Sequence, residues 1–260
     1  MNRLSFQIGN AMKIHCLGTA GYHPNDRRQT SCYYLPESGI ALDAGTGMYR
    51  LPNVMAGNTL DILLSHAHLD HTAGLTFLLE LAATYPVERI QIWGEAEKLE
   101  AVQEHLFHPL MFPAKLQATW HPIDDLDEFR IGGVRLTWRR QEHPGGSVAY
   151  RLEWQDGKRL VYSTDTTGDT SAEHIAWSYS ADLLLHECNF SNKDVDWALT
   201  TGHSWTDRVA QVARLSSPKK LLLTHLNPLE TSPDPIESAL IQEQLEGELV
   251  LAEDGLEVTF

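Results

Sequence analysis

The chain of 260 residues has few cysteines and no long apolar run. Its three cysteines, Cys16, Cys32 and Cys188, form no Cys-x-x-Cys pair, and any disulfide would leave one thiol over. This usage suits a reducing compartment and buried thiols rather than a disulfide-stabilised secreted domain. No run of about 18 apolar residues is present for a membrane span, and the first residues lack the apolar segment and cleavage site of a signal peptide. We therefore expect a cytoplasmic protein with no membrane segment.

Positive charge is also scarce. Lys and Arg number 20 against 35 Asp and Glu, which gives a formal net charge of −15. The basic pairs at 27–28, 139–140 and 219–220 are short and read as ordinary solvated side chains. Long nucleic acids bind chiefly through clusters of Lys and Arg that neutralise phosphates. A large nucleic acid is therefore not an expected partner.

Apolar runs that end at polar or glycine-rich turns recur along the chain and predict strands. They cover residues 13–18, 39–45, 60–66, 89–94, 134–140, 148–154, 159–165, 181–187, 219–225 and 255–260. Amphipathic stretches of helical length lie at 72–85, 95–107, 204–216 and 234–246. No Gly/Ser linker divides the chain, so we expect one α/β domain over 1–260, with 1–11 as a loose extension. The pattern favours two sheets packed face to face with helices outside.

The stretch SHAHLDHTAG, residues 65–74, concentrates metal-binding side chains directly after the apolar run LDILL. His66 and His68 are two residues apart on an extended backbone, so both side chains project to the same side and can bind one cation. Asp70 and His71 follow as the chain turns into a helix and can face a second cation. Imidazole and carboxylate ligands suit zinc, with manganese and iron left open. A single histidine would more often be structural, but four ligand-type residues in six favour a metal site.

Further ligands follow other predicted strands, whose ends should converge on one edge of the sheets. His143, Asp165 and His225 each close an apolar run. If Asp165 bridges two ions, His66, His68 and His143 complete one site, and Asp70, His71 and His225 complete the other. Two divalent ions would lower the pKa of a shared water and hold the oxygens of a phosphoryl or acyl group.

These motifs resemble those of metallo-β-lactamase-fold hydrolases, with HAHLDH as the signature. More narrowly, CLGTAG, HPGGSVAYRLE, STDT, LLLHECNF, TGHSW and LLLTHLNP are similar, in this order, to motifs of the ribonuclease Z branch. The resemblance runs from residue 14 to about 228. It implies a four-layer αββα sandwich and a hydrolase that uses two divalent ions. A homodimer is common in this branch.

The resemblance also implies catalytic roles outside the ligand set. Asp70 would act in catalysis as well as in metal binding. His203 matches a histidine that protonates the leaving oxygen, and Glu187 matches the carboxylate that orients it. The adjacent His186 also matches a catalytic position, although a buried structural histidine is an equal alternative. Independently of the resemblance, Ser204 can cap a helix that begins after it, and the positive N-terminal end of this helix would attract a phosphate.

The chain departs from the branch where transfer-RNA-processing members carry a long RNA-gripping arm. The strands AYRLEW and RLVYSTD are separated only by QDGK, and Asp156 and Gly157 suit a tight hairpin turn. Two divalent ions would change the formal charge only from −15 to −11, which disfavours a large RNA away from the site. We therefore predict a dinuclear phosphodiesterase that acts on a small phosphodiester.

Several alternatives remain open at this stage. The chain could be a transfer-RNA 3′ endonuclease, with the RNA grip supplied by a partner or another loop. It could hydrolyse a lactone, thioester or sulfate ester, as other members of the fold do. Outside enzymes, it could be a metal-stabilised binding module. Asp43 is expected to position a metal histidine, and the segment 105–122 is expected either to wall the substrate pocket, to form a dimer contact, or to pack on the core through Leu106, Phe107 and Phe112.

Overall fold

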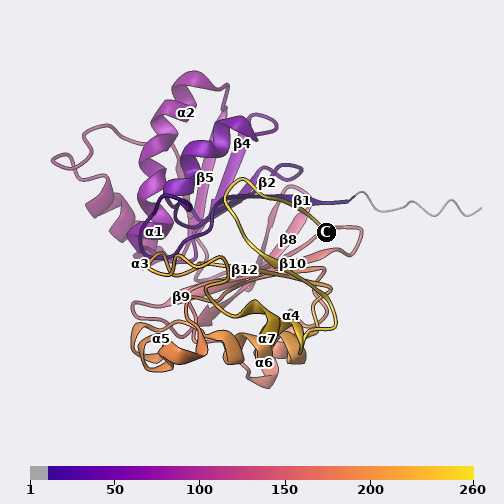
Figure 1. The fold of residues 1–260 in the computed structure, drawn as a ribbon. Helices are drawn as coiled ribbons and strands as arrows, with labels where there is room; N and C mark the ends of the chain where they lie inside the picture. The colour runs from indigo at the N-terminus through magenta and orange to yellow at the C-terminus, as the bar shows by residue number, and fades with distance from the viewer. Residues whose placement is uncertain (1–10) are drawn as a thin grey trace, which may run out of the picture.

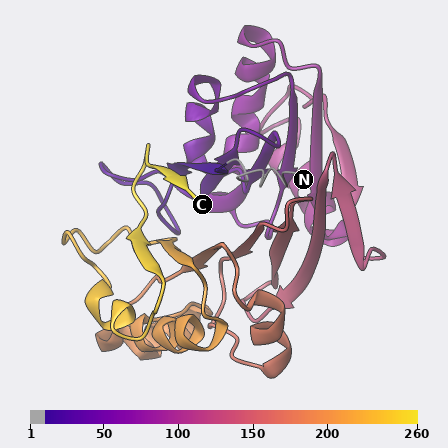
Figure 2. The ribbon, with the colours of Figure 1, turned by 90° about the vertical axis from the view of Figure 1, so that its right-hand side faces the viewer.

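Two seven-stranded β-sheets stack face to face, and helices cover the outer face of each (Figures 1 and 2). The computed structural model describes residues 11–260. The expected loose extension at 1–11 falls, apart from Ala11, outside the described residues. This arrangement is the four-layer αββα sandwich that the sequence predicts.

The first sheet is built from the N-terminal half of the chain and the last strand. Its strands occur in the order β14-β1-β2-β3-β4-β5-β6. Their bounds are β1 Lys13–Gly18, β2 Cys32–Leu35, β3 Ile40–Leu42, β4 Thr59–Leu63, β5 Arg89–Gly94, β6 Thr119–Pro122 and β14 Glu257–Thr259. Strands β3 to β6 pair in parallel, so the loops that follow β3, β4 and β5 leave from the same edge of the sheet.

The second sheet has the order β13-β12-β11-β10-β9-β8-β7. Its strands are β7 Glu128–Ile131, β8 Val134–Gln141, β9 Ser147–Glu153, β10 Arg159–Ser163, β11 Leu183–Glu187, β12 Lys220–Thr224 and β13 Glu248–Leu251. Strands β10 to β13 pair in parallel. The chain therefore leaves β10, β11 and β12 at the same edge of the sheet. Asp165, Glu187 and His225 lie at this edge.

The helices are short and form the two outer layers (Figure 1). On the first sheet they are η1 Thr46–Asn53, α1 Leu69–Thr72, η2 Ala73–Phe77, α2 Leu78–Thr84, α3 Ala96–Ala101 and η3 Val102–Leu106. On the second they are α4 Ala172–Ser178, η4 Asn192–Asp194, α5 Val195–Thr201, α6 Thr206–Ser216 and α7 Ser238–Gln242. Within the described part of the chain, no helix is long and apolar enough to span a bilayer.

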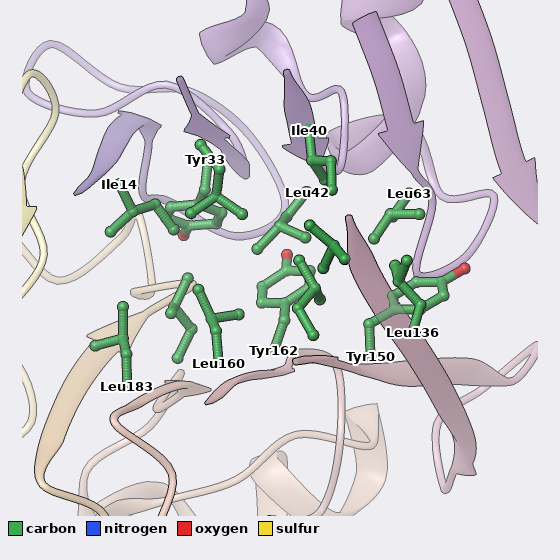
Figure 3. Close-up of a cluster of buried hydrophobic side chains, with 14 of the residues drawn as sticks. Ile14, Tyr33, Ile40, Leu42, Leu63, Leu136, Tyr150, Leu160, Tyr162 and Leu183 are labelled. Atoms are coloured by element: carbon green, nitrogen blue, oxygen red, sulfur yellow. The ribbon is translucent and has the colours of Figure 1, made fainter. Parts of the chain in front are cut away.

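The sheets are buried on both faces, and alternation along each strand divides the core into layers. Leu160 and Tyr162 of β10 point into the cluster between the sheets, while Val161 packs under the helices of the second sheet. The same alternation places Ile40 and Leu42 of β3 between the sheets (Figure 3). The β3, β10 and β11 runs are therefore almost continuously apolar, as expected for strands covered on both faces.

The connection between β9 and β10 is a tight turn, as QDGK predicts. Trp154 and Lys158 close it with a 3.0 Å backbone hydrogen bond, and Gly157 has a φ of +88°. Asp156 does not adopt a positive φ, so only the glycine carries the left-handed conformation. No arm extends from this turn.

Candidate metal centre

The seven predicted metal ligands meet between the two sheets, at the edge where the strands end. The loop after β4 supplies His66 and His68, and α1 supplies Asp70 and His71. The loops after β8, β10 and β12 supply His143, Asp165 and His225. The structure brings all seven together although they span residues 66 to 225.

The first group consists of His66, His68, His143 and Asp165, with one candidate ligand atom from each residue lying within 4.8 Å of the others. The Nε2 atoms of His66 and His143 each lie 3.5 Å from Oδ2 of Asp165. Nδ1 of His68 lies 3.3 Å from Nε2 of His143. This is the first of the two sets predicted from the HAHLDH stretch and the residues that follow other strands.

The second group consists of Asp70, His71, Asp165 and His225. Oδ1 of Asp165 lies 3.1 Å from Nε2 of His71 and 3.3 Å from Nε2 of His225. Asp165 therefore turns Oδ2 toward the first group and Oδ1 toward the second. One carboxylate can serve both sites.

The hydrogen bonds of His71 and His143 occupy Nδ1 and leave Nε2 facing the centre, where it can bind a cation. Nδ1 of His71 donates to Asp43 Oδ2 at 2.7 Å, and Nδ1 of His143 donates to the Gly202 carbonyl at 2.9 Å. In a neutral ring the other nitrogen, Nε2, then carries a lone pair. Nε2 of His71 nevertheless lies 3.2 Å from Nε2 of His225, and Nε2 of His66 is buried with no hydrogen-bond partner. Ring nitrogens that converge in this way, beside carboxylates, suit divalent metal ions once the nitrogens are deprotonated.

The protonation states agree with this chemistry. Burial lowers the pKa of His66, His68 and His143, which favours the neutral form that binds metal. Burial opposes ionisation of Asp165, but His225, His71 and His66 hold its pKa well below the usual value. His71 differs, because Asp165, Asp70 and Asp43 outweigh burial and raise its pKa well above the usual value. A metal bound by His71 would displace that proton.

Neighbouring groups hold the candidate ligands in place. Asp43 accepts from His71, from Ser65 and from the hydroxyl of Tyr162, as the sequence leads us to expect of an outer carboxylate. The amide nitrogen of Asn189 lies 3.1 Å from Nδ1 of His225. The backbone N–H of Tyr22 donates to Asp70 Oδ2 at 2.7 Å. Such contacts fix ring orientation and ligand basicity.

The backbone at this centre is unusual. Tyr22, Asp43, Asp165 and His225 all have positive φ, between 49° and 57°. Non-glycine residues rarely adopt this conformation, and they persist in it only where the surrounding structure holds them. Four such residues around one centre indicate a site whose geometry is fixed by the fold.

His203, which is half-buried, pairs with the buried Glu187 beside the ligands. Nδ1 of His203 lies 2.9 Å from Oε1 of Glu187, and the carboxylate also accepts from the backbone N–H groups of Thr166 and Ser204. Burial would lower the pKa of His203, but Glu187 outweighs it and raises the pKa to about 9. The His203 ring lies 5.0 Å from the ring of His143 and 5.2 Å from that of His225, measured between centroids.

Near this pair, the structure contradicts the predicted Ser204 cap and favours one of the two alternatives for His186. Ser204 does not cap α6, because the N-cap position of this helix is occupied by Trp205. The Ser204 hydroxyl instead donates to the Glu187 carbonyl. The first N–H groups of α6 are bound to Phe190 and Asn192, so they are not free for a phosphate. His186 is buried, its Nδ1 bonds the Glu187 carbonyl at 2.7 Å, and it does not line the cavity, which favours the structural alternative.

A cavity of about 850 Å³ opens over the metal centre. Its lining residues are Tyr22, His68, Leu69, Asp70, His143, Pro144, Asp165, Asn189, Phe190, Asp194, Trp197, Thr201, His203, Asn227, Pro228, Leu229 and Glu230. The volume lies in the range of small-molecule sites. A small substrate can therefore reach the candidate ligands and His203 from one side.

The segment 105–122 does not line this cavity, which disfavours the alternative that it walls the substrate pocket. Leu106 and Phe107 pack against the core under the first sheet, and Phe112 meets Phe107 edge to face. Leu110 and Met111 are exposed. The structure therefore favours the packing alternative for this segment.

Sequence reasoning missed Tyr22, Asn189, Gly202 and Trp197 as residues of the site. Tyr22 and Gly202 contact candidate ligands through their backbone, and Asn189 contacts His225 through its side chain. The spacing of ligand residues in the sequence does not reveal such contacts. Gly21 offers one usable signal, because a Cβ there would lie 2.3 Å from Cε1 of His225. A glycine next to a ligand-bearing strand end can mark such close approach.

Comparison with known proteins gives consistent matches. Residues 40–226 match the β-lactamase superfamily domain. A protein named ribonuclease Z from Prochlorococcus marinus (strain MIT 9312) is 44% identical over 286 residues, covering 86% of this chain and 91% of the relative. That alignment is longer than the 260 residues of this chain, so the relative carries segments with no counterpart here.

Two solved structures share the fold. The short form of human tRNase Z has a TM-score of 0.75 at 21% identity, over 95% of this chain and 98% of that one. A diphosphatase from the PhnP family has a TM-score of 0.72 at 19% identity, over 96% of this chain and 97% of that one. At these identities the likeness bears on the fold alone.

Proposed function

Because this chain belongs to the metallo-β-lactamase superfamily, in its ribonuclease Z family of metal-dependent hydrolases, we propose that it hydrolyses a small phosphodiester at a centre of two divalent ions. The observation that carries the proposal is the sharing of Asp165 between two four-residue groups at the floor of one cavity. His203, held by Glu187, lines the same cavity.

The seven candidate ligands form two groups, each suited to one ion. His66, His68 and His143 would hold one, Asp70, His71 and His225 would hold the other, and Asp165 belongs to both groups. The imidazole-rich set favours zinc, while manganese and iron remain compatible with it. When bound, two such ions polarise a phosphoryl group and make a water acidic enough to supply a nucleophile near neutral pH.

The residues of this chain then position the ester and manage the leaving proton. Nδ1 of His203 is occupied by Glu187, so Nε2 is the nitrogen left to donate a proton to the leaving oxygen. Glu187 is itself held by two backbone N–H groups and is buried. It acts as a positioning residue, because it fixes the ring and stabilises the protonated imidazole without touching the ester.

Two features support a substrate smaller than transfer RNA. The β9–β10 connection is a tight turn with no arm, and the chain carries a formal charge of −15. Exposed charges act over about 8–10 Å at physiological salt, so a long RNA backbone would meet unfavourable charge away from the metals. A diester with a single phosphate places its one negative charge at the metal centre and not along this acidic surface.

Hydrolysis of bis-p-nitrophenyl phosphate by the metal-loaded protein tests the proposal. We expect turnover that a chelator abolishes and that added zinc or manganese restores. Activity that survives complete removal of metal, checked by elemental analysis, contradicts a metal-dependent mechanism. Turnover of lactone, thioester or sulfate esters without any turnover of the diester contradicts the phosphodiesterase assignment.

A second candidate function is cleavage of transfer-RNA precursors at the 3′ end, favoured by the 44% identity to a protein named ribonuclease Z. An assay with a precursor transfer RNA separates the two proposals. We expect slow or misplaced cleavage at a salt concentration near physiological, because the arm is missing. Efficient cleavage at the processing site contradicts the size argument and establishes the second function.

A further inference from the structure

The mouth of the cavity over the metal centre gathers exposed apolar side chains. Of eleven large apolar side chains exposed in residues 11–260, four line this one cavity. They are Tyr22, Leu69, Trp197 and Leu229, with exposures of 75%, 67%, 63% and 72%. We name these four residues the apolar rim. Exposed apolar groups scattered singly need no explanation, but a cluster at a cavity marks a binding surface.

The apolar rim is assembled from four separate segments. Tyr22 lies in the loop after β1, Leu69 begins α1, Trp197 lies on α5, and Leu229 follows β12. No single amphipathic helix creates it. Tyr22 adopts a φ of +57° while its N–H binds Asp70, so the segment that carries its ring is held by a contact with the metal centre.

The charges around the apolar rim are unsuited to a second phosphate. Among the described residues that line the cavity there is no Lys and no Arg, whereas Asp194 and Glu230 contribute carboxylates in addition to Asp70 and Asp165. The neighbouring Lys193 lies 3.2 Å from Glu230 and is paired with it. Apart from His203, any part of the substrate beyond the phosphate at the metals therefore meets apolar, neutral polar or acidic surface.

The size of the cavity leaves room for such a part. Its volume of about 850 Å³ exceeds what one phosphate and two metal ions occupy, and it matches pockets that hold ligands of drug size. Trp197 is the largest flat side chain of the apolar rim. Aromatic and heteroaromatic rings stack on such a face, and the stacking is worth about 1–3 kcal/mol where the ring is a nucleobase.

We propose that the substrate carries one uncharged aromatic or heteroaromatic ester group, and that Trp197 binds this group at the cavity mouth. The inference rests on the proposed function, because it places the phosphate at the metal centre. It narrows the substrate class to singly charged phosphodiesters with a flat ring. Trp197 is then a specificity residue that distinguishes a ring from an alkyl group.

The chain offers a matched control on the same helix. Leu199 is two residues from Trp197 on α5, is 54% exposed, and does not line the cavity. Leu199→Ala therefore removes a comparably exposed apolar side chain from α5 without touching the apolar rim. Trp197→Phe keeps a flat ring at the position, whereas Trp197→Ala removes it.

Phenyl phosphate and methyl phosphate are suitable probes, because they share the phosphate and differ in the ring, and neither contains a diester bond. Their binding to the zinc-loaded protein is measured by isothermal titration calorimetry, with zinc content checked for every variant. We expect phenyl phosphate to bind about tenfold more tightly than methyl phosphate, which corresponds to a single stacking contact. Trp197→Ala should bring the ratio close to one, while Trp197→Phe and Leu199→Ala should retain most of it.

The outcomes separate this inference from the function on which it rests. A ratio near one in the unaltered protein, or a ratio that survives Trp197→Ala, overturns the role of Trp197. A ratio that falls equally in Leu199→Ala overturns it as well, since the effect would then belong to the helix as a whole. If the ratio behaves as expected but no phosphodiester is hydrolysed, the ring site stands and the proposed function fails.

Discussion

Three tyrosines in the core between the sheets provide a graded test of how buried hydroxyl groups contribute to stability (Figure 3). Tyr33, Tyr150 and Tyr162 are all fully buried in this core. The Tyr162 hydroxyl donates to the Asp43 carboxylate at 2.7 Å, and that of Tyr150 donates to the Leu64 carbonyl at 2.8 Å. The Tyr33 hydroxyl lies near the side chains of Ser31 and Thr224, but neither meets the distance and angle of a normal hydrogen bond. Substitution by phenylalanine removes only the hydroxyl in each case.

The structure predicts a different loss of unfolding free energy for each substitution. Tyr162→Phe removes a bond to a buried charge, which is worth about 1.5–3 kcal/mol. Tyr150→Phe removes a bond to a neutral carbonyl, worth about 1 kcal/mol. Tyr33→Phe removes an unpaired buried hydroxyl, so we expect no loss, or a gain of up to about 1 kcal/mol.

Urea unfolding followed by far-ultraviolet circular dichroism measures these differences. The protein is freed of metal with a chelator, because bound metal would add its own binding energy to the apparent stability. The slopes of the transitions should match among the variants, so that the midpoints report stability. Equal losses for Tyr33→Phe and Tyr162→Phe would refute the reasoning, since the two rings are equally buried and differ in their hydrogen bonds.

Three further predictions concern the metal ligands, the proposed acid and a buried histidine. Asp165→Ala should lose metal from both groups, and elemental analysis that still finds two ions would contradict a shared carboxylate. His203→Ala should keep its metal and lose roughly 10²–10⁴-fold in turnover of a diester with an alkoxide leaving group. It should lose less with p-nitrophenolate, which needs no proton, and an equal loss with both leaving groups would contradict the acid assignment. Burial lowers the pKa of His174 to about 4, so the stability it provides is present above its unfolded pKa near 6.5 and is lost as the pH falls toward 4. His174→Gln should reduce this acid-induced loss by up to roughly 3 kcal/mol in unfolding titrations, and unchanged pH dependence would contradict the shift.

Periodicity predicted the fold well where strands are covered on both faces. All ten predicted strand segments contain strands of the structure, among them β4, β10 and β12, which lead to the metal ligands. The strands β2, β6, β7 and β13 were not predicted. They have four residues each. Shortness alone does not explain the omission, because β3 and β14 have three residues each and lie within predicted segments. The helices α4 and α5, of seven residues each, were not predicted either.

The ligand set was the part of the site best suited to prediction, because histidines and carboxylates at strand ends leave a local pattern. The contacts that orient these side chains are different in kind. The Gly202 carbonyl that holds His143, and the Tyr22 N–H that holds Asp70, belong to the backbone and carry no sequence signature. The failure of Ser204 to cap α6 has a similar origin, because the hydroxyl bonds the Glu187 carbonyl instead.

The turn between β9 and β10 lies far from the candidate metal ligands that flank these two strands. His143 precedes β9 and Asp165 follows β10, while the turn joins the opposite ends of these strands. At about 3.4 Å per residue, the seven residues of β9 place the turn roughly 20 Å from the metal ligands. A long segment inserted at this turn would begin well outside the cavity over the metal centre. The entropic cost of closing the loop would rise only slowly with the length of the segment. Reach toward a large substrate can therefore be gained or lost in this architecture without disturbing a single metal ligand.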